Sequence, residues 1–186
     1  MPRLFVALEL PEWLRERLSI LQQGLPDVRW VPPEQMHITL RFIGEVDRPT
    51  FHETMYALAN VGTRPFDLEL KGLGHFPPRG PLRQLWVGVV AHPELLHLKR
   101  RIDRALRDIG VEAEGRKFSP HVTLGRFRLP PPENRLASFL RRHGLFAAPA
   151  FPVSDFHLVS SALHPDGAIH EIEASYELVP GAEECS

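Results

Sequence analysis

Polar and apolar residues follow two different periods along the chain. Alternation rich in β-branched and aromatic residues predicts strands, at residues 3–10, 37–43, 66–73, 82–90, 121–127, 153–163 and 170–179. Apolar residues at helical spacing predict helices, several of them opened by a proline or closed by a glycine, at residues 11–23, 49–59, 93–109 and 132–143. Helices and strands are thus interspersed, and no glycine- or serine-rich linker divides the chain.

The predicted elements occur twice in the same order. Strand, helix, strand, strand runs over about residues 37–90 and again over about residues 121–179, and each copy begins with a histidine-containing strand. Two copies of this length do not form a solenoid, which needs more and shorter repeats. We therefore expect an α+β fold with two lobes related by a pseudo-twofold axis, each an antiparallel sheet flanked by helices, with the active-site cleft between them. Residues 1–186 are expected to form a single domain.

Length, charge and cysteine content narrow the class of protein. The 186 residues carry 22 Lys+Arg against 23 Asp+Glu, whereas an extended grip on duplex nucleic acid needs a strongly basic face. The longest apolar runs fall far short of the roughly 20 residues that span a bilayer, and no signal peptide is apparent. The single cysteine, Cys185, provides neither an internal disulfide nor a cysteine-based zinc site. We expect a cytoplasmic protein with no membrane partner.

One tetrapeptide appears at the start of both predicted copies. Residues 37–40 read HITL and residues 121–124 read HVTL, and together they hold two of the chain's five threonines. Because side chains alternate faces along a strand, each histidine and the threonine two residues later point the same way, and the apolar residues point into the core. A pseudo-twofold axis that brings the two strands together would therefore make two imidazoles and two hydroxyls converge.

This combination of groups suits phosphodiester hydrolysis. Imidazole has an ordinary pKa of about 6.5, so His37 and His121 can act as a general acid and a general base near neutral pH. One would deprotonate water and the other would protonate the departing ribose oxygen. The hydroxyls of Thr39 and Thr123 would donate hydrogen bonds to the non-bridging phosphate oxygens. Proton transfer and hydrogen bonding share the work, so the chemistry requires neither a metal nor another cofactor.

The sequence resembles the 2H phosphoesterases, which are named for two H-x-T/S-hydrophobic motifs. Within them it is similar to the RNA 2′,3′-cyclic phosphodiesterases, historically called 2′-5′ RNA ligases. The resemblance covers nearly the whole chain and includes RLFVALELP, RWVPPEQMHITLRFIGEV, GLGHFPP with LWVGV, and SPHVTLGRF. It implies a bilobal, metal-independent enzyme of RNA processing, and we expect a monomer. The implied substrates are RNA ends or small cyclic nucleotides with a 2′,3′-cyclic phosphate, which become 2′-phosphomonoesters. It also implies that His37 is the proton donor and His121 the proton acceptor. The residues alone do not distinguish this assignment from the opposite one.

Two arginines are candidates for binding the phosphate. Arg41 lies two residues after Thr39, so strict alternation places it on the same face as His37. Arg126 lies an odd number of positions after His121 and should point away, but the family resemblance favours it as a ligand of the phosphate. A bulge at the neighbouring glycine, residue 125, would turn its side chain back toward the site.

Other conspicuous residues have ordinary structural interpretations. His157, His164 and His170 fall in or beside the last predicted hairpin and are interpreted as strand and turn residues. Arginine outnumbers lysine 19 to 3, and the run KRR at residues 99–101 continues with Arg104 and Arg107 along the polar side of a predicted helix. This side is interpreted as a solvated face, and a contact surface for an RNA backbone is the alternative.

Three alternatives to the leading hypothesis stay open. Ten histidines could build a metal site for metal-dependent hydrolysis, although no H-E-x-x-H or comparably dense ligand spacing occurs. A non-catalytic module that binds RNA ends or nucleotides would bind a cyclic phosphate without turnover. The third is 2′-5′ RNA ligation or 2′,5′-phosphodiesterase activity; ligating and hydrolysing a 2′-5′ linkage are the two directions of one reaction, and bulk water favours hydrolysis.

Overall fold

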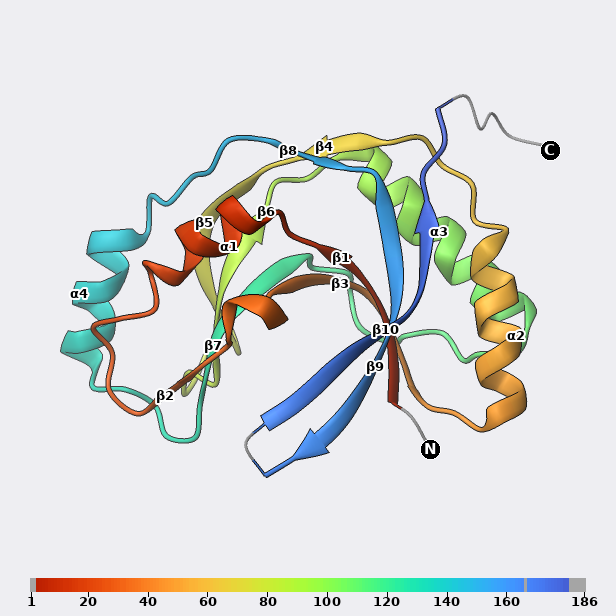
Figure 1. Ribbon diagram of the computed structural model, residues 1–186. Helices are drawn as coiled ribbons and strands as arrows, with labels where there is room; N and C mark the ends of the chain where they lie inside the picture. Colours follow the sequence, from red (N-terminus) through yellow and green to blue (C-terminus); the bar gives the residue numbers. More distant parts are fainter. Residues whose placement is uncertain (1–2, 166, 181–186) are drawn as a thin grey trace.

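Strands from both halves of the chain join into one antiparallel sheet. The computed structural model describes residues 3–165 and 167–180, and Figure 1 shows their arrangement. The first half contains β1 (Arg3–Glu9), α1 (Glu12–Ser19), β2 (Val28–Trp30), the 3₁₀ turn η1 (Pro33–Gln35), β3 (His37–Glu45), α2 (Arg48–Ala59), β4 (Phe66–Leu68), β5 (Leu70–Phe76) and β6 (Gln84–Val89). The second half contains α3 (Pro93–Asp108), β7 (His121–Phe127), α4 (Glu133–His143), β8 (Phe151–Val153), β9 (Asp155–His164) and β10 (Gly167–Glu177).

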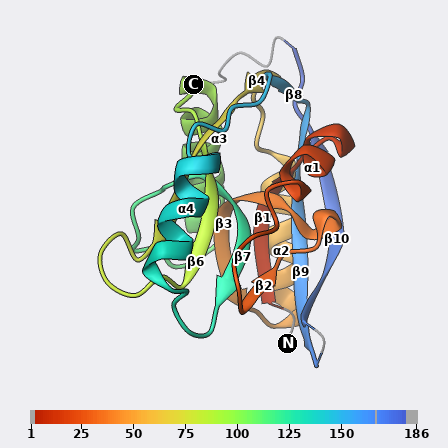
Figure 2. The ribbon, with the colours of Figure 1, turned by 90° about the vertical axis from the view of Figure 1, so that its left-hand side faces the viewer.

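The sheet consists of two groups of strands that meet at one narrow junction. Its order is β10-β9-β1-β3-β7-β6-β5, with β2 also paired to β7, and β4 pairs with β8 in a separate small sheet. The junction is the antiparallel pairing of β3 with β7, whose register places Ile38 opposite Val122. We call β1, β3, β9 and β10 with α2 and α3 the His37 lobe, and β2, β5, β6 and β7 with α1 and α4 the His121 lobe. Figure 2 views the molecule from the side of α1 and α4.

The fold class is as predicted, but the lobes do not coincide with the two halves of the sequence. The prediction placed residues 37–90 in one lobe and residues 121–179 in the other. In the structure β5 pairs with β6, β6 pairs with β7 from the second half, and β9 pairs with β1 from the first half. Each lobe therefore takes strands from both halves. Hydrophobic periodicity identifies a strand without specifying its partner, so this exchange was not predictable from the pattern.

The main core lies between the sheet and the helices, and the apolar residues that set the periodicity of each element point into it. Ile38, Leu40, Val122 and Leu124 are at most 1% exposed, and the stripe of α3 formed by Leu95, Leu98, Ile102 and Leu106 is equally buried. Two predicted boundaries differ from the structure. The helix α1 ends at Ser19, before the predicted end near Gly24, and the chain continues in turns. The predicted strand 66–73 divides into β4 and β5, which belong to different sheets.

A β-bulge follows the threonine in both repeated motifs. In β3 the residues paired with β1 are Thr39 and Arg41, so Leu40 lies in the bulge. In β7 the residues paired with β6 are Thr123 and Gly125, so Leu124 lies in the bulge. The extra residue reverses the alternation beyond it, because two consecutive positions now face the core. Both strands accordingly begin with the same order of burial: half-buried, buried, half-buried, buried, buried, exposed.

No helix within residues 3–165 and 167–180 combines the length and the apolar character that a transmembrane span requires.

Candidate active site

His37 begins β3 and is held at both ring nitrogens. Its Nδ1 lies 2.7 Å from the backbone oxygen of Gln35 at the end of η1, and its Nε2 lies 3.1 Å from Oγ1 of Thr39. A carbonyl oxygen can only accept a hydrogen bond, so in the neutral ring the proton is on Nδ1. The lone pair of Nε2 therefore faces the threonine, on the side of the strand opposite the core.

His121 begins β7 and repeats this geometry. Its Nδ1 lies 2.7 Å from the backbone oxygen of Ser119, again two residues earlier in the chain. Its Nε2 lies 3.1 Å from the side-chain nitrogen of Gln84, which also donates to Oγ1 of Thr123 at 2.7 Å. Both imidazoles thus have the same tautomer, in which Nδ1 is anchored to the backbone and Nε2 is the reactive nitrogen.

The junction of β3 and β7 brings the two motifs together on one face. With Ile38 opposite Val122, the residues on either side of each project from the other face of the sheet. The four predicted side chains His37, Thr39, His121 and Thr123 therefore share the face opposite the main core. The charge of His121 acts on the pKa of His37, as expected for neighbouring imidazoles.

Gln84 connects the groups around His121, although no motif in the sequence indicates it. It begins β6, opposite Arg126 in the register of β6 and β7. Its side-chain oxygen accepts a hydrogen bond of 3.0 Å from Nη1 of Arg126, which fixes its amide nitrogen toward Thr123. A glutamine outside any motif joins a site through strand pairing, and the residue pattern alone does not reveal that pairing.

The two candidate arginines lie on opposite faces. The bulge in β7 turns Arg126 to the face of the histidines, where its charge lowers the pKa of His37, His121 and His170. Arg41 is 3% exposed on the core side, where it forms an ion pair of 3.2 Å with Asp103 and donates a hydrogen bond to the backbone oxygen of Glu112. The expectation that Arg41 shares a face with His37 is thus corrected: strict alternation fails at the bulge before it.

His170 is a third imidazole in the site, although its sequence context indicated an ordinary strand residue. It lies on β10, and its ring contacts the ring of His37 edge-on, with 5.3 Å between ring centroids. Phe5 of β1 contacts both rings, at 5.0 Å from His37 and 5.1 Å from His170. The contact depends on β10 joining β9 and β1 across the two halves of the chain, so sequence spacing could not indicate it.

The two sides of the site differ in character. Phe42 of β3 occupies the position beyond the bulge that corresponds to Arg126 in β7. Its side chain is 58% exposed, and its ring centroid lies 6.2 Å from that of Phe5. The ring of His121 is instead bordered by Phe76 at 5.1 Å and Trp86 at 5.8 Å. The His37 side is therefore apolar and aromatic, and the His121 side combines an aromatic border with a cation.

Burial dominates the electrostatics of both histidines. It lowers the pKa of His37 to about 4, against the partial compensation of the hydrogen bond to Gln35, and the charges of His170, Arg126 and His121 lower it further. Burial and the charge of Arg126 also lower the pKa of His121. Both rings are therefore neutral at pH 7 without a ligand. Arg126 has its own pKa lowered by burial and by Arg29, and no carboxylate pairs with it in the described part of the chain.

The donors in the site are suited to an anion. Two hydroxyls, a guanidinium group and the amide of Gln84 converge beside the two Nε2 atoms. Within residues 3–165 and 167–180, no group of three or more His, Cys, Asp or Glu side chains is placed to hold a metal. This arrangement can bind a phosphate and move protons on both sides of it.

Comparison with known proteins connects this geometry to a family. Residues 8–86 and residues 87–170 each match the family model described as LigT like phosphoesterase. An RNA 2′,3′-cyclic phosphodiesterase from Archaeoglobus fulgidus is 34% identical over 172 residues, which are 91% of this chain and 96% of that protein. Another from Aeropyrum pernix is 37% identical over 158 residues, which are 84% of this chain and 89% of that protein.

Solved structures share the whole fold. The structure of TT0787 from Thermus thermophilus has a TM-score of 0.77 at 29% identity, and the match covers 95% of this chain and 97% of that chain. LigT of Escherichia coli, solved with 3′-AMP, has the same fold, with a TM-score of 0.75 at 24% identity over 96% of this chain and 99% of that chain. The resemblance inferred from the two motifs is confirmed: this chain belongs to the LigT-like phosphoesterases of the 2H phosphoesterase superfamily.

Proposed function

We propose that this protein hydrolyses RNA ends bearing a 2′,3′-cyclic phosphate to 2′-phosphomonoesters, with His37 as proton donor and His121 as proton acceptor and without a metal. The observation that carries the proposal is the repeated geometry of the two imidazoles. Each has Nδ1 anchored to a backbone oxygen and Nε2 directed to the shared face. The relatives named RNA 2′,3′-cyclic phosphodiesterase supply the substrate class.

The anion-binding groups come first in the proposed mechanism. The cyclic phosphate is held by the hydroxyls of Thr39 and Thr123 and by the guanidinium group of Arg126, which has no competing carboxylate in the described residues. These donors stabilise the charge that builds on the non-bridging oxygens in the transition state. The negative phosphate also favours protonation of the neighbouring His37, whose pKa is low in the free protein.

Two proton transfers then complete the hydrolysis. Nε2 of neutral His121 takes a proton from a water molecule as the water oxygen bonds to phosphorus. The bond between phosphorus and the ribose 3′ oxygen breaks, and protonated His37 gives its proton to that oxygen. The products are a 2′-phosphomonoester and a 3′ hydroxyl, with His121 protonated and His37 neutral. Exchange with solvent restores the starting protonation states.

The mechanism is tested with a nucleoside 2′,3′-cyclic phosphate and the variants His37→Ala and His121→Ala. A proton-transfer role predicts a loss of kcat on the order of 10²-fold or more for each variant. His164→Ala, at the exposed end of β9, is the matched control and should retain full activity. Near wild-type turnover in either single variant would refute the two-histidine mechanism, and circular dichroism establishes that each variant is folded.

The same assay separates the remaining alternatives. Saturable binding of the cyclic phosphate without turnover by the wild type would indicate a non-catalytic nucleotide-binding module. Loss of turnover in excess chelator, with recovery on adding a divalent metal, would indicate metal-dependent hydrolysis. A 3′-phosphate product would overturn the proposed direction of ring opening, and 2′-5′-linked oligonucleotides test the related diesterase and ligase reactions. The proposal includes a cytoplasmic, monomeric protein that makes no extended grip on duplex RNA.

A further inference from the structure

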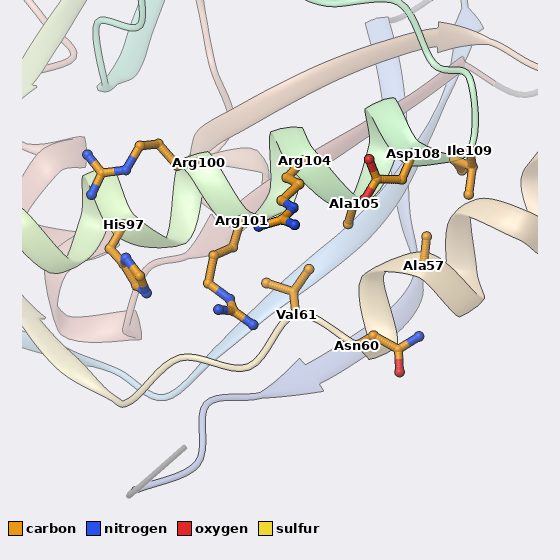
Figure 3. A pocket seen from close by; sticks show the side chains of 10 residues that line it. All are labelled: Ala57, Asn60, Val61, His97, Arg100, Arg101, Arg104, Ala105, Asp108 and Ile109. Atoms are coloured by element: carbon orange, nitrogen blue, oxygen red, sulfur yellow. The ribbon is translucent and has the colours of Figure 1, made fainter. Parts of the chain in front are cut away.

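A groove between α2 and α3 lies away from the histidines. Its volume is about 630 Å³, and α3 contributes most of its polar lining (Figure 3). The opposite side of α3 packs toward the core face of β3, where Asp103 pairs with Arg41. Since the histidine side chains project from the other face of that strand, the groove and the proposed active site are separate. The proposed hydrolysis uses none of its residues.

Arginine and histidine side chains dominate the polar part of this groove. His97, Arg100, Arg101 and Arg104 follow one another on α3, and Asp108 is the acidic residue in the lining. In Figure 3 the side chains of Arg101 and His97 extend toward the segment containing Val61. At a rise of about 1.5 Å per residue, the span from His97 to Arg104 covers about 10 Å, which exceeds the width of a single phosphate.

The arginines of the groove lack partners among the described residues. Arg100, Arg101 and Arg104 make no ion pair or side-chain hydrogen bond with any residue that the structure describes, and the buried Nε of Arg101 lacks an acceptor there. Asp103, the acid nearest them in sequence, is engaged instead by Lys99 at 2.6 Å and by Arg41. A buried guanidinium nitrogen without an acceptor is unfavourable, so a ligand that supplies acceptors would complete this group.

The lining of the groove also includes apolar residues. Ala57 lies in the last turn of α2 and Val61 just beyond it, and Ala105 and Ile109 lie on and just beyond the last turn of α3. A binding site that combines apolar lining with a few polar groups fits an organic ligand with charged ends better than a small ion alone. The whole chain has a net charge of −1, so this cluster is a local feature rather than a result of general basicity.

We propose that the groove between α2 and α3 is a second binding site, specific for phosphate-bearing ligands. The planar fork of arginine matches phosphate oxygens in bidentate geometry, and several arginines on one helix face can contact more than one phosphate group. Nucleotides with a polyphosphate and the backbone of an RNA present the same chemistry. Arg101 and Arg104 are the principal ligands, and neither takes part in the hydrolysis proposed above.

The test uses the intact protein with pyrophosphate, ATP and a short single-stranded RNA as separate probes. The Nε–H signals of Arg101 and Arg104 in ¹⁵N NMR should shift saturably, with a dissociation constant below about 1 mM for at least one probe. The variant Arg101→Gln/Arg104→Gln should weaken that binding at least about tenfold, as read from the backbone amide signals of α3, which both proteins retain. The matched control Arg107→Gln/Arg135→Gln removes the same charge from residues that do not line the groove and should bind as the wild type does.

Activity assays identify the source of the phosphate. If RNA is the ligand, the groove variant should show a raised KM for the RNA and an unchanged KM for a cyclic mononucleotide. If a nucleotide is the ligand, ATP should bind more tightly than the RNA, and both KM values should stay unchanged. Absence of a saturable shift with all three probes, or equal weakening in the control variant, would overturn the proposal. Binding is read from the signals of α3 and its arginines, so the result does not depend on whether the protein hydrolyses cyclic phosphates.

Discussion

Titrating the imidazole of His37 tests how the site is organised before a substrate arrives. Burial, together with the charges of His170, Arg126 and His121, lowers its pKa from 6.5 to about 4. This difference corresponds to about 3 kcal/mol against the protonated ring. A phosphate held by Thr39, Thr123 and Arg126 places negative charge beside the ring and should recover a large part of that energy, so the pKa should rise when an anion binds.

Proton NMR of the imidazole Cε1–H measures both values directly. The signal is assigned by its loss in His37→Asn, and the titration is run without ligand and with a saturating 2′-nucleotide. We expect a pKa near 4 without ligand and a rise of at least about one pH unit with it. A value near 6.5 in the free protein, or no rise while binding is saturated, would refute the electrostatic part of the proposed mechanism.

The same pKa sets a dependence of stability on pH. Between pH 6.5 and about pH 4, His37 is protonated in the unfolded chain but stays neutral in the folded protein, so acid favours unfolding. The free energy of unfolding is therefore unaffected by this group above pH 6.5 and decreases as the pH falls toward 4. At pH 5 the loss is about 2 kcal/mol. Urea denaturation at pH 7.5 and pH 5 should therefore show a smaller difference for His37→Asn than for the wild type, and equal differences would contradict the low pKa.

Three further substitutions test other parts of the structure. Gln84→Ala removes the hydrogen bonds that orient the groups around the second motif and should lower kcat/KM for a cyclic nucleotide about tenfold; unchanged kcat/KM would exclude this orienting role. His170→Ala removes the edge-on contact with His37 and should lower kcat/KM about 3- to 10-fold, whereas His170→Phe keeps the ring and should retain most activity; equal values for both variants would contradict a role for the ring. Gly125→Ala places a Cβ 2.6 Å from a side chain of β2 and should cost about 1–3 kcal/mol of unfolding free energy in urea. Gly115→Ala meets nothing within 4 Å and should not share that loss.

The local sequence pattern predicted most of the helices and strands and the two histidine–threonine pairs at the centre of the site. The alternation in HITL and HVTL predicts that each histidine shares a face with its threonine and that Ile38 and Val122 enter the core, as the structure shows. The helical period and the helix-breaking residues likewise predict α3, whose observed end at Asp108 is one residue before the predicted end. These features depend on side-chain direction along one element, which the sequence determines directly.

The remaining parts of the site depend on contacts between distant segments. A bulge changes the face of every residue beyond it. Strict alternation therefore placed Arg41 on the wrong face of β3, and Arg126 reaches the face of the histidines only because β7 contains a bulge. Gln84 reaches Thr123 through the pairing of β6 with β7, and His170 reaches His37 through the order β10-β9-β1-β3. Strand order is a property of the assembled sheet, and a single sequence does not specify it.

The exchange of strands between the two halves determines how the chain could be divided. A cut in the loop at residues 90–92 would give one fragment with β1, β3, β5 and β6 and another with β7, β9 and β10, so each fragment would hold part of the sheet of both lobes. Neither fragment could complete either sheet alone, and each would carry one of the two histidines. Reassembly of such fragments would rebuild both lobes and the paired imidazoles in a single event, which makes this loop a natural position for a split enzyme whose activity reports that its two pieces have met.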